Sequence, residues 1–220
     1  TGEEVRSNLR QTASGRWDDD FRAVARQLKN AGYADAIIRL GHEADNRFSP
    51  WSARNNSSEY IAAFRHIHDV MSSQSPMFRF DWTTTRANFR RWGVPAYPGD
   101  AYVDVIGLDI YWREKSQISD RDWQQYRSAL QAHLDFALAR NKPVSFPEWG
   151  RALGDTGRFL SLMHQWFTSL PANGAGSLLY QSYFNPVAQR GYDLENLPNV
   201  KRVYVDTFRN WSSSRVPAPP

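Results

Sequence analysis

The sequence predicts an α/β fold with a parallel sheet. Short, mostly apolar segments alternate with amphipathic helical stretches along the 220 residues, which is the pattern of parallel strands joined by helices. Two architectures share this pattern, a doubly wound sheet and a (β/α)8 TIM barrel. No glycine-rich phosphate loop follows any of the apolar segments, so the nucleotide-binding form of the doubly wound sheet is disfavoured and the TIM barrel is preferred.

The first half of the chain is predicted to contain two helices and two strands. Residues 17–31 carry apolar side chains at helical spacing, and Gly32 behind them is a typical helix stop. AIIRL, residues 36–40, is short and β-branched, which indicates a strand. Residues 58–72 begin beside capping serines and have a second helical stripe. The aromatic segment MFRFDW, residues 77–82, predicts a second strand.

The second half of the chain repeats the alternation. Residues 102–112, 143–149 and 176–184 are rich in β-branched and aromatic side chains, as strands are. Residues 120–140 and 156–169 carry apolar side chains every three or four positions, which predicts helices between these strands.

The chain is expected to form one domain, residues 1–211, because its length and 41% hydrophobic content suit a single core. A last helix is expected from Pro198, since proline fits the first helical turn. Residues 1–16 are predicted to be a loop or a strand remnant, and residues 83–100 to be irregular. The serine- and proline-rich residues 212–220 are predicted to be a C-terminal tail.

Composition excludes several classes of site. The chain has no cysteine, which rules out disulfides, zinc–thiolate sites and a cysteine nucleophile. Its charge of +4 is modest and its basic residues are scattered, with the densest cluster at 86–91, so no nucleic-acid partner is expected. No apolar run approaches the ~20 residues of a membrane span. His, Asp and Glu are not grouped at metal-ligand spacing, so no metal or cofactor is expected. Ser145 lacks the Gly-x-Ser-x-Gly motif of serine hydrolases.

Strand periodicity places polar residues on shared faces. The three sets are Arg39, Gly41 and Glu43; Gly107, Asp109 and Tyr111; and Val144, Phe146 and Glu148. A barrel interior accepts small and polar side chains near its C-terminal end more easily than a flat sheet covered by helices does. Asp109 is therefore expected to pair with Arg39 inside the barrel.

Two glutamates, Glu43 and Glu148, follow predicted strands, at the end where barrel active sites lie. Either one alone could be a loop carboxylate or a cap. A pair of carboxylates is the equipment of glycoside hydrolysis, in which one group donates a proton and the other attacks the anomeric carbon. The 9 Trp, 10 Tyr and 12 Phe residues, several of them at the ends of apolar runs, also favour a carbohydrate ligand.

Three segments resemble glycoside hydrolase family 26, a family of clan A retaining endo-acting enzymes on a (β/α)8 barrel. RLGHEADNRFSPW, YVDVIGLDIYW and KPVSFPEWG are similar to its fourth, sixth and seventh strand motifs, in that order. The resemblance covers about residues 13–211. It implies an endo-β-mannanase-like hydrolase, with β-1,3-xylan and β-glucan as other substrates of the family, and a secreted or periplasmic location.

The resemblance also implies roles for individual residues. Glu43 would be the acid/base and Glu148 the nucleophile. The candidate substrate-binding residues are His42, Phe48, Trp51, Tyr111, Trp112, Trp149, Tyr180 and Arg39. The sequence departs from the family at sugar-contacting positions, among them Asp45 and Phe48. A non-catalytic carbohydrate-binding protein and a transglycosidase remain alternatives.

Five predicted strands are fewer than the eight of a barrel, which typically has ~250 residues. The chain is therefore expected to carry about strands 4–8 and to be incomplete at its N-terminus. A five-stranded unit would have an open sheet edge, so a second chain that supplies the N-terminal strands is an expected partner. A shortened, rearranged sheet is the alternative.

Overall fold

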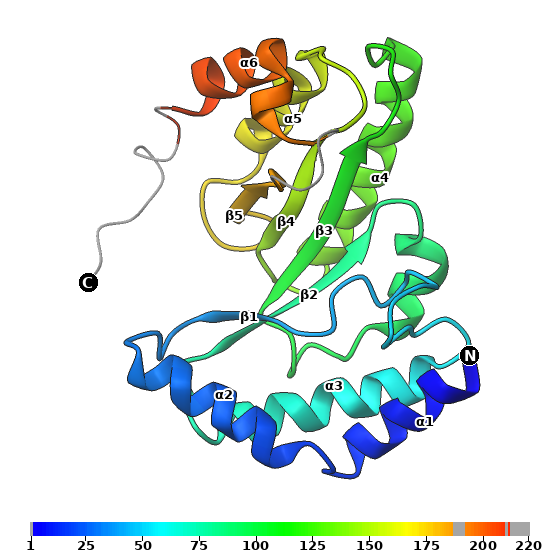
Figure 1. Ribbon diagram of the computed structural model, residues 1–220, viewed down its shortest axis with the longest axis vertical. Coiled ribbons are helices and arrows are strands. Elements are labelled where there is room, and N and C mark those ends of the chain that lie inside the picture. The colour runs from blue at the N-terminus through cyan, green and yellow to red at the C-terminus, as the bar shows by residue number, and fades with distance from the viewer. Residues whose placement is uncertain (1, 187–191, 210, 212–220) are drawn as a thin grey trace.

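The computed structural model describes residues 2–186, 192–209 and 211. The predicted tail at 212–220 lies outside the described residues. Five strands form one parallel sheet in sequence order, without the reversal that defines a doubly wound sheet. The strands are β1 (Ile37–Arg39), β2 (Arg79–Thr85), β3 (Val105–Trp112), β4 (Val144–Arg151) and β5 (Leu178–Tyr183). The sheet is a curled half-barrel (Figure 1).

Six α-helices are described. They are α1 (Gly2–Ala13), α2 (Asp18–Asn30), α3 (Ser57–Ser72), α4 (Asp120–Leu138), α5 (Arg158–Ser169) and α6 (Pro198–Phe208). In Figure 1, α1, α2 and α3 lie together at the β1–β2 end, and α5 and α6 lie at the β4–β5 end. Every strand and helix for which both bounds were predicted begins and ends within three residues of them, and α6 begins at the predicted Pro198. Residues 83–100 hold only short helical turns after the end of β2.

The prediction for residues 1–16 is wrong, because Gly2–Ala13 forms α1 rather than a loop or strand remnant. Leu9 is buried on this helix, and Val5 packs one turn before it. Arg10 on the outer side forms a 3.1 Å ion pair with Glu59 of α3. Two apolar residues four positions apart were the helical signal.

The apolar core lies between the outer face of the sheet and the helices. Its largest fully buried side chains include Trp82, Phe80, Phe146 and Phe167. Phe146 of β4 and Phe167 of α5 contact each other with ring centroids 4.9 Å apart. Truncation of such a ring to alanine typically costs ~3–5 kcal/mol, so this layer fixes the strands that carry the polar inner face.

The inner face of the sheet contains a buried polar layer centred on Asp81 of β2. The Asp81 carboxylate accepts hydrogen bonds from Thr83 Oγ1 at 2.6 Å, Ser145 Oγ at 2.5 Å and the Tyr180 hydroxyl at 2.7 Å. A Cβ at Gly107 would lie 2.5 Å from Asp81 Oδ1. Glycine is therefore required where β3 crosses this layer.

An irregularity in β4 corrects the predicted strand phase. Between two aligned pairs, β3 advances from Gly107 to Ile110 while β4 advances from Ser145 to Trp149, so β4 contains one extra residue. Ser145 faces the polar interior, and Phe146, which was predicted to share the face of Glu148, packs against α5 instead. The extra residue returns Glu148 to the inner face.

Candidate active site

The carboxylate of Glu148 is held by residues of two other strands. Tyr111 on β3 donates its hydroxyl to Glu148 Oε2 at 2.8 Å, and Arg39 at the end of β1 donates Nη1 to Oε1. Arg39 Nη2 binds Asp109, whose other oxygen accepts from the Glu148 backbone N–H at 3.0 Å. The predicted ion pair between Arg39 and Asp109 is confirmed. It fixes the guanidinium group that orients Glu148.

These contacts determine the protonation of Glu148. Burial raises the pKa of this carboxyl group. The hydrogen bond and charge of Arg39, together with the Tyr111 hydroxyl, lower it by more than burial raises it, so the pKa is below its usual value. Glu148 is therefore ionised at neutral pH. An ionised carboxylate whose two oxygens are both oriented meets the requirements of a nucleophile in glycoside cleavage.

Glu43 lies on a tight turn directly after β1. Its φ is +51° and that of Gly41 is +54°, and this left-handed region is uncommon for residues with a side chain. The Glu43 N–H donates to the Thr83 carbonyl at 2.9 Å, and Asn46 Nδ2 donates to Glu43 Oε2 at 3.0 Å. Such strain costs ~1–3 kcal/mol and is concentrated at functional sites, which supports a functional role for this side chain.

Asp45 fastens the same turn to β2. Its side chain is fully buried and accepts from the Thr85 N–H at 2.9 Å and from the Thr85 hydroxyl at 2.8 Å. Burial raises the pKa of Asp45 to about 6 despite these hydrogen bonds. Arg54 Nε donates to the Asp45 carbonyl at 3.0 Å. Asp45 therefore holds the loop that presents Glu43.

His42 is half-buried and lies beside the ring of Trp51. Burial lowers its pKa, the charge of Arg39 lowers it further, and Glu148 and Glu43 oppose the change. The imidazole is therefore neutral at pH 7. Its edge meets the ring of Trp51 at a centroid distance of 5.3 Å, and Trp51 Nε1 donates to the His42 carbonyl at 2.6 Å.

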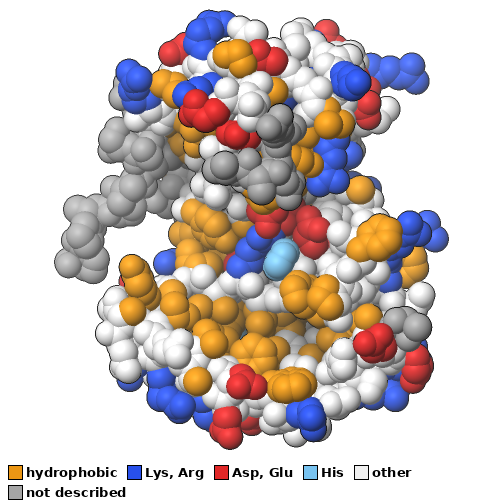
Figure 2. All heavy atoms as spheres, viewed as in Figure 1, with side chains coloured by type: hydrophobic (Ala, Val, Ile, Leu, Met, Phe, Trp, Pro, Cys, Tyr) orange, Lys and Arg blue, Asp and Glu red, His pale blue; other side chains and the backbone are white. Residues whose placement is uncertain are grey.

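A cleft of roughly 440 Å³ opens at the C-terminal ends of β1, β2 and β3. Phe48, which is 76% exposed, forms part of its wall. The other lining residues are Glu43, Asn46, Thr85, Arg86, Ala87, Asn88, Asp109, Tyr111, Arg113, Glu114 and Tyr126. Figure 2 shows a histidine with acidic and basic side chains around it, above a hollow lined by hydrophobic side chains.

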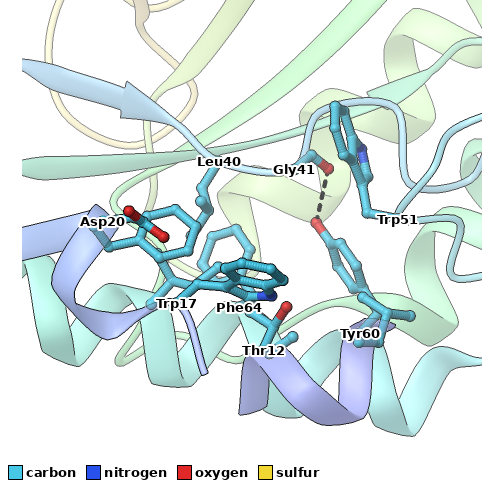
Figure 3. Close-up of a pocket in the computed structure, with 12 residues that line it drawn as sticks. Thr12, Trp17, Asp20, Leu40, Gly41, Trp51, Tyr60 and Phe64 are labelled. Atoms are coloured by element: carbon cyan, nitrogen blue, oxygen red, sulfur yellow. Dashed lines mark hydrogen bonds between the residues drawn. The ribbon is translucent and has the colours of Figure 1, made fainter. Parts of the chain in front are cut away.

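Three tryptophans predicted to contact substrate lie elsewhere. Trp112 is 6% exposed and Trp149 is fully buried, the latter among Phe167 and other core rings, so their predicted sugar contacts are wrong. Trp51 lines a separate apolar cavity of roughly 430 Å³, with Tyr60 beside it (Figure 3). It donates to the His42 carbonyl, one residue before Glu43, and is not among the residues that line the cleft.

Tyr180 also has a structural partner. Its hydroxyl donates to the buried Asp81, which places it in the polar layer of the half-barrel interior. The sequence missed Asn46, Arg86 and Arg113, which line the cleft from the loops after β1, β2 and β3. Their positions just after strand ends were the available signal.

Within the described residues, no group of three or more His, Cys, Asp or Glu side chains could hold a metal ion. The helices of this part of the chain are all too short or too polar to cross a membrane.

Comparisons with known proteins support the same fold. Residues 11–143 match the sequence model of Glycosyl hydrolase family 26. A relative named Endoglucanase H from Acetivibrio thermocellus is 28% identical over 160 residues, which is 69% of this chain and 18% of that protein. Mannan endo-1,4-beta-mannosidase A and B from Caldalkalibacillus mannanilyticus is 24% identical over 194 residues, 84% of this chain and 32% of that protein.

Solved structures resemble the chain over most of its length. A modular endo-beta-1,4-mannanase from Cellulomonas fimi superposes with a TM-score of 0.65 and 21% identity, over 91% of this chain and 49% of that one. The Bacillus subtilis mannanase BCman gives a TM-score of 0.62 with 16% identity, over 92% and 58%. The chain thus spans about half the length of these structures, and its five strands correspond to part of their TIM barrel. It belongs to glycosyl hydrolase family 26.

Proposed function

We propose that the protein is a retaining, endo-acting β-glycoside hydrolase that cleaves a β-1,4-mannan-type polysaccharide. The observation that carries the proposal is the arrangement around Glu148: an ionised carboxylate oriented by Arg39 and Tyr111, at the same end of the sheet as Glu43. Both glutamates influence the pKa of His42, which burial and Arg39 lower, so they lie within electrostatic reach of one imidazole.

In the first step, a Glu148 oxygen attacks the anomeric carbon while Glu43 donates its proton to the departing glycosidic oxygen. The bond to the leaving sugar breaks, and a covalent glycosyl-enzyme forms on Glu148. In the second step, Glu43 removes a proton from water, the water oxygen attacks the anomeric carbon, and Glu148 is released as a carboxylate. Retaining geometry requires the two carboxyl groups to be ~5–5.5 Å apart in the substrate complex. His42, which is neutral, would hydrogen-bond a sugar hydroxyl beside them.

The substrate assignment follows the relatives. Several are named mannan endo-1,4-beta-mannosidases, and this favours mannan. The name Endoglucanase H of another relative makes a β-glucan the second candidate. A polymer of this kind is met outside the cytoplasm, so we place the enzyme in a secreted or periplasmic location. Transglycosylation would use the same residues with a sugar in place of water. A second chain that supplies further barrel strands along β1 belongs to the same proposal.

The test combines turnover, stereochemistry and trapping. Glu43→Gln and Glu148→Gln should each reduce mannan cleavage by at least a thousandfold, whereas the surface control Glu195→Gln, which removes only an ion pair with Lys201, should not. Proton NMR should show the β-anomer first. A 2-deoxy-2-fluoro mannoside should add its glycosyl mass to the peptide containing Glu148.

Azide separates the two roles. With an activated aryl mannoside, azide should rescue Glu148→Ala by forming the α-glycosyl azide, and Glu43→Ala by forming the β-azide. If both glutamine variants kept wild-type turnover, the catalytic assignment would fail. If no glycan were cleaved by the wild type while oligosaccharides still bound, the protein would instead be a carbohydrate-binding protein.

A further inference from the structure

Two arginines occupy the cleft at corresponding positions in the fold. Arg86 is the first residue after β2, and Arg113 is the first residue after β3. Both line the cleft together with Glu43 and Tyr111. Because the C-terminal ends of parallel strands meet at one side of a barrel, both side chains enter the space that a bound polysaccharide would fill.

Both guanidinium groups lie against aromatic rings instead of carboxylates. The Arg86 Cζ atom is 3.8 Å from the ring centroid of Tyr126, and the Arg113 Cζ atom is 4.8 Å from that of Tyr111. Among the described residues, neither forms an ion pair, in contrast to Arg39, which binds two carboxylates. An arginine stacked on a ring keeps its edge N–H donors available and has lost part of its side-chain freedom before a ligand arrives.

The acids near the two arginines have other partners. Asp109 forms an ion pair with Arg39, and Asn46 Nδ2 donates to Glu43 Oε2 at 3.0 Å. Glu114 remains at the exposed rim. Burial raises the pKa of Tyr126, whereas the charge of Arg86, a hydrogen bond from its side chain and the charge of Arg113 oppose that rise, and the charge of Glu114 adds to it. Both arginines therefore lie close enough to Tyr126 to act on it electrostatically.

We propose that the cleft takes an acidic polysaccharide, and that Arg86 and Arg113 pair with the carboxylate of a uronic acid bound beside Tyr111. The inference rests on the proposed glycosidase function and replaces its neutral mannan with a mannan-type glycan that also contains carboxylate-bearing sugars. A planar guanidinium can donate two parallel N–H bonds to a carboxylate. Neutral mannose or glucose has no group that would pair with either charge.

The first experiment measures kcat/KM on three forms of one polysaccharide. They are native glucomannan, the same glucomannan partly oxidised at C6 to uronate, and the oxidised sample reduced back to the alcohol. We expect kcat/KM of the wild type to be about tenfold higher on the oxidised sample at low salt, the size of one charge-assisted hydrogen bond. Re-reduction should restore the original value, and 0.5 M NaCl should remove most of the preference, since salt screens partly exposed charges.

The arginine variants identify the groups responsible. Arg86→Gln and Arg113→Gln should each abolish most of the preference for oxidised glucomannan. Arg91→Gln is the matched control, because Arg91 is an exposed arginine that also stacks on a ring, that of Trp92 at 5.1 Å, and does not line the cleft. Equal kcat/KM on native and oxidised glucomannan, or equal effects of all three variants, would overturn the inference.

A binding measurement keeps this inference separate from the catalytic proposal. Oligosaccharides released from oxidised glucomannan are titrated into Glu148→Gln while the arginine Nε–H resonances are followed by NMR. Shifts at Arg86 and Arg113 that the re-reduced oligosaccharides do not cause would support the inference even if no glycan were cleaved. Absence of selective shifts would overturn it, while cleavage of native glucomannan would still support the glycosidase.

Discussion

Tyr111→Phe should slow glycoside cleavage without unfolding the protein. The substitution removes one hydroxyl group, which donates to Glu148 Oε2 at 2.8 Å. The ring remains, and with it the edge contacts to Phe184 at 5.7 Å and Tyr192 at 5.4 Å. The perturbation is therefore confined to Glu148, the proposed nucleophile, and to the stacked Arg113.

The magnitude follows from the hydrogen bond. A bond to a charged group contributes ~1.5–3 kcal/mol, and the Glu148 side chain is 25% exposed, which argues for the lower half of that range because water replaces part of the contact. Each ~1.4 kcal/mol corresponds to a factor of ten in rate. We expect kcat/KM at the pH optimum to fall about tenfold, and the free energy of unfolding to change by less than ~1 kcal/mol.

The pH profile gives a second readout. Burial raises the pKa of Glu148, but Arg39 and Tyr111 together lower it by a larger amount, so it lies below its usual value. Loss of the Tyr111 hydroxyl removes one of the groups that lower this pKa. The nucleophile must be deprotonated, so the acid limb of kcat/KM should move to higher pH in Tyr111→Phe.

The assay measures kcat/KM on an aryl β-mannoside between pH 3 and 9, with Tyr33→Phe as control, since Tyr33 is 61% exposed and outside the cleft. An acid limb that stays in place, or moves to lower pH, would refute the reasoning that Tyr111 stabilises an ionised Glu148. Loss of activity in Tyr33→Phe would indicate a general effect on the fold.

Three further predictions concern the supporting residues. Burial raises the pKa of Asp45 from 3.8 to about 6, so ionisation of this group lowers the free energy of unfolding as pH rises from ~4 to ~6. Asp45→Asn cannot ionise, so its free energy of unfolding, measured with urea, should increase relative to that of the wild type by up to about 3 kcal/mol across that pH range. Arg39→Met leaves the 1%-exposed Asp109 carboxylate unpaired and should lower the unfolding free energy by ~3–5 kcal/mol at pH 7, less at pH 4. Gly107→Ala places a Cβ 2.5 Å from Asp81 Oδ1 and should lower the thermal midpoint through an overpacking cost of ~1–3 kcal/mol.

The two candidate glutamates could be located from the sequence because Glu148 lies on a strand and Glu43 follows one closely. A strand fixes the direction of its side chains by period two, so Arg39 and Asp109 could be assigned to one interior from the sequence, and the structure joins them. The alternation of faces along β4 could not be followed from Val144 to Glu148, because one extra residue lies between them and reverses the expected face. Pro147 was the clue, since it cannot donate a ladder hydrogen bond and is confined to edges and bulges within sheets.

The alternation of side chains along β4 also explains why the predicted sugar contact of Trp149 is wrong. Trp149 follows Glu148 directly, so when the carboxylate points to the inner face of the sheet, the indole must face the helices, where it is fully buried against Phe167 and Phe208. A position at a strand end is therefore not sufficient for sugar contact. Alternation of side chains along a strand places Trp149 and Glu148 on opposite faces.

Specificity was less predictable than chemistry for a physical reason. Phe48, Arg86 and Arg113 line the cleft from segments that follow the strands, and these segments have no periodicity from which a side-chain direction can be read. Their roles emerge only from contacts, such as the stacking of Arg86 on Tyr126. In the proposed function, Glu148 on β4 and Glu43 in the turn after β1 determine the reaction, whereas Arg86 and Arg113, at the bases of the loops after β2 and β3, are proposed to select an acidic polymer.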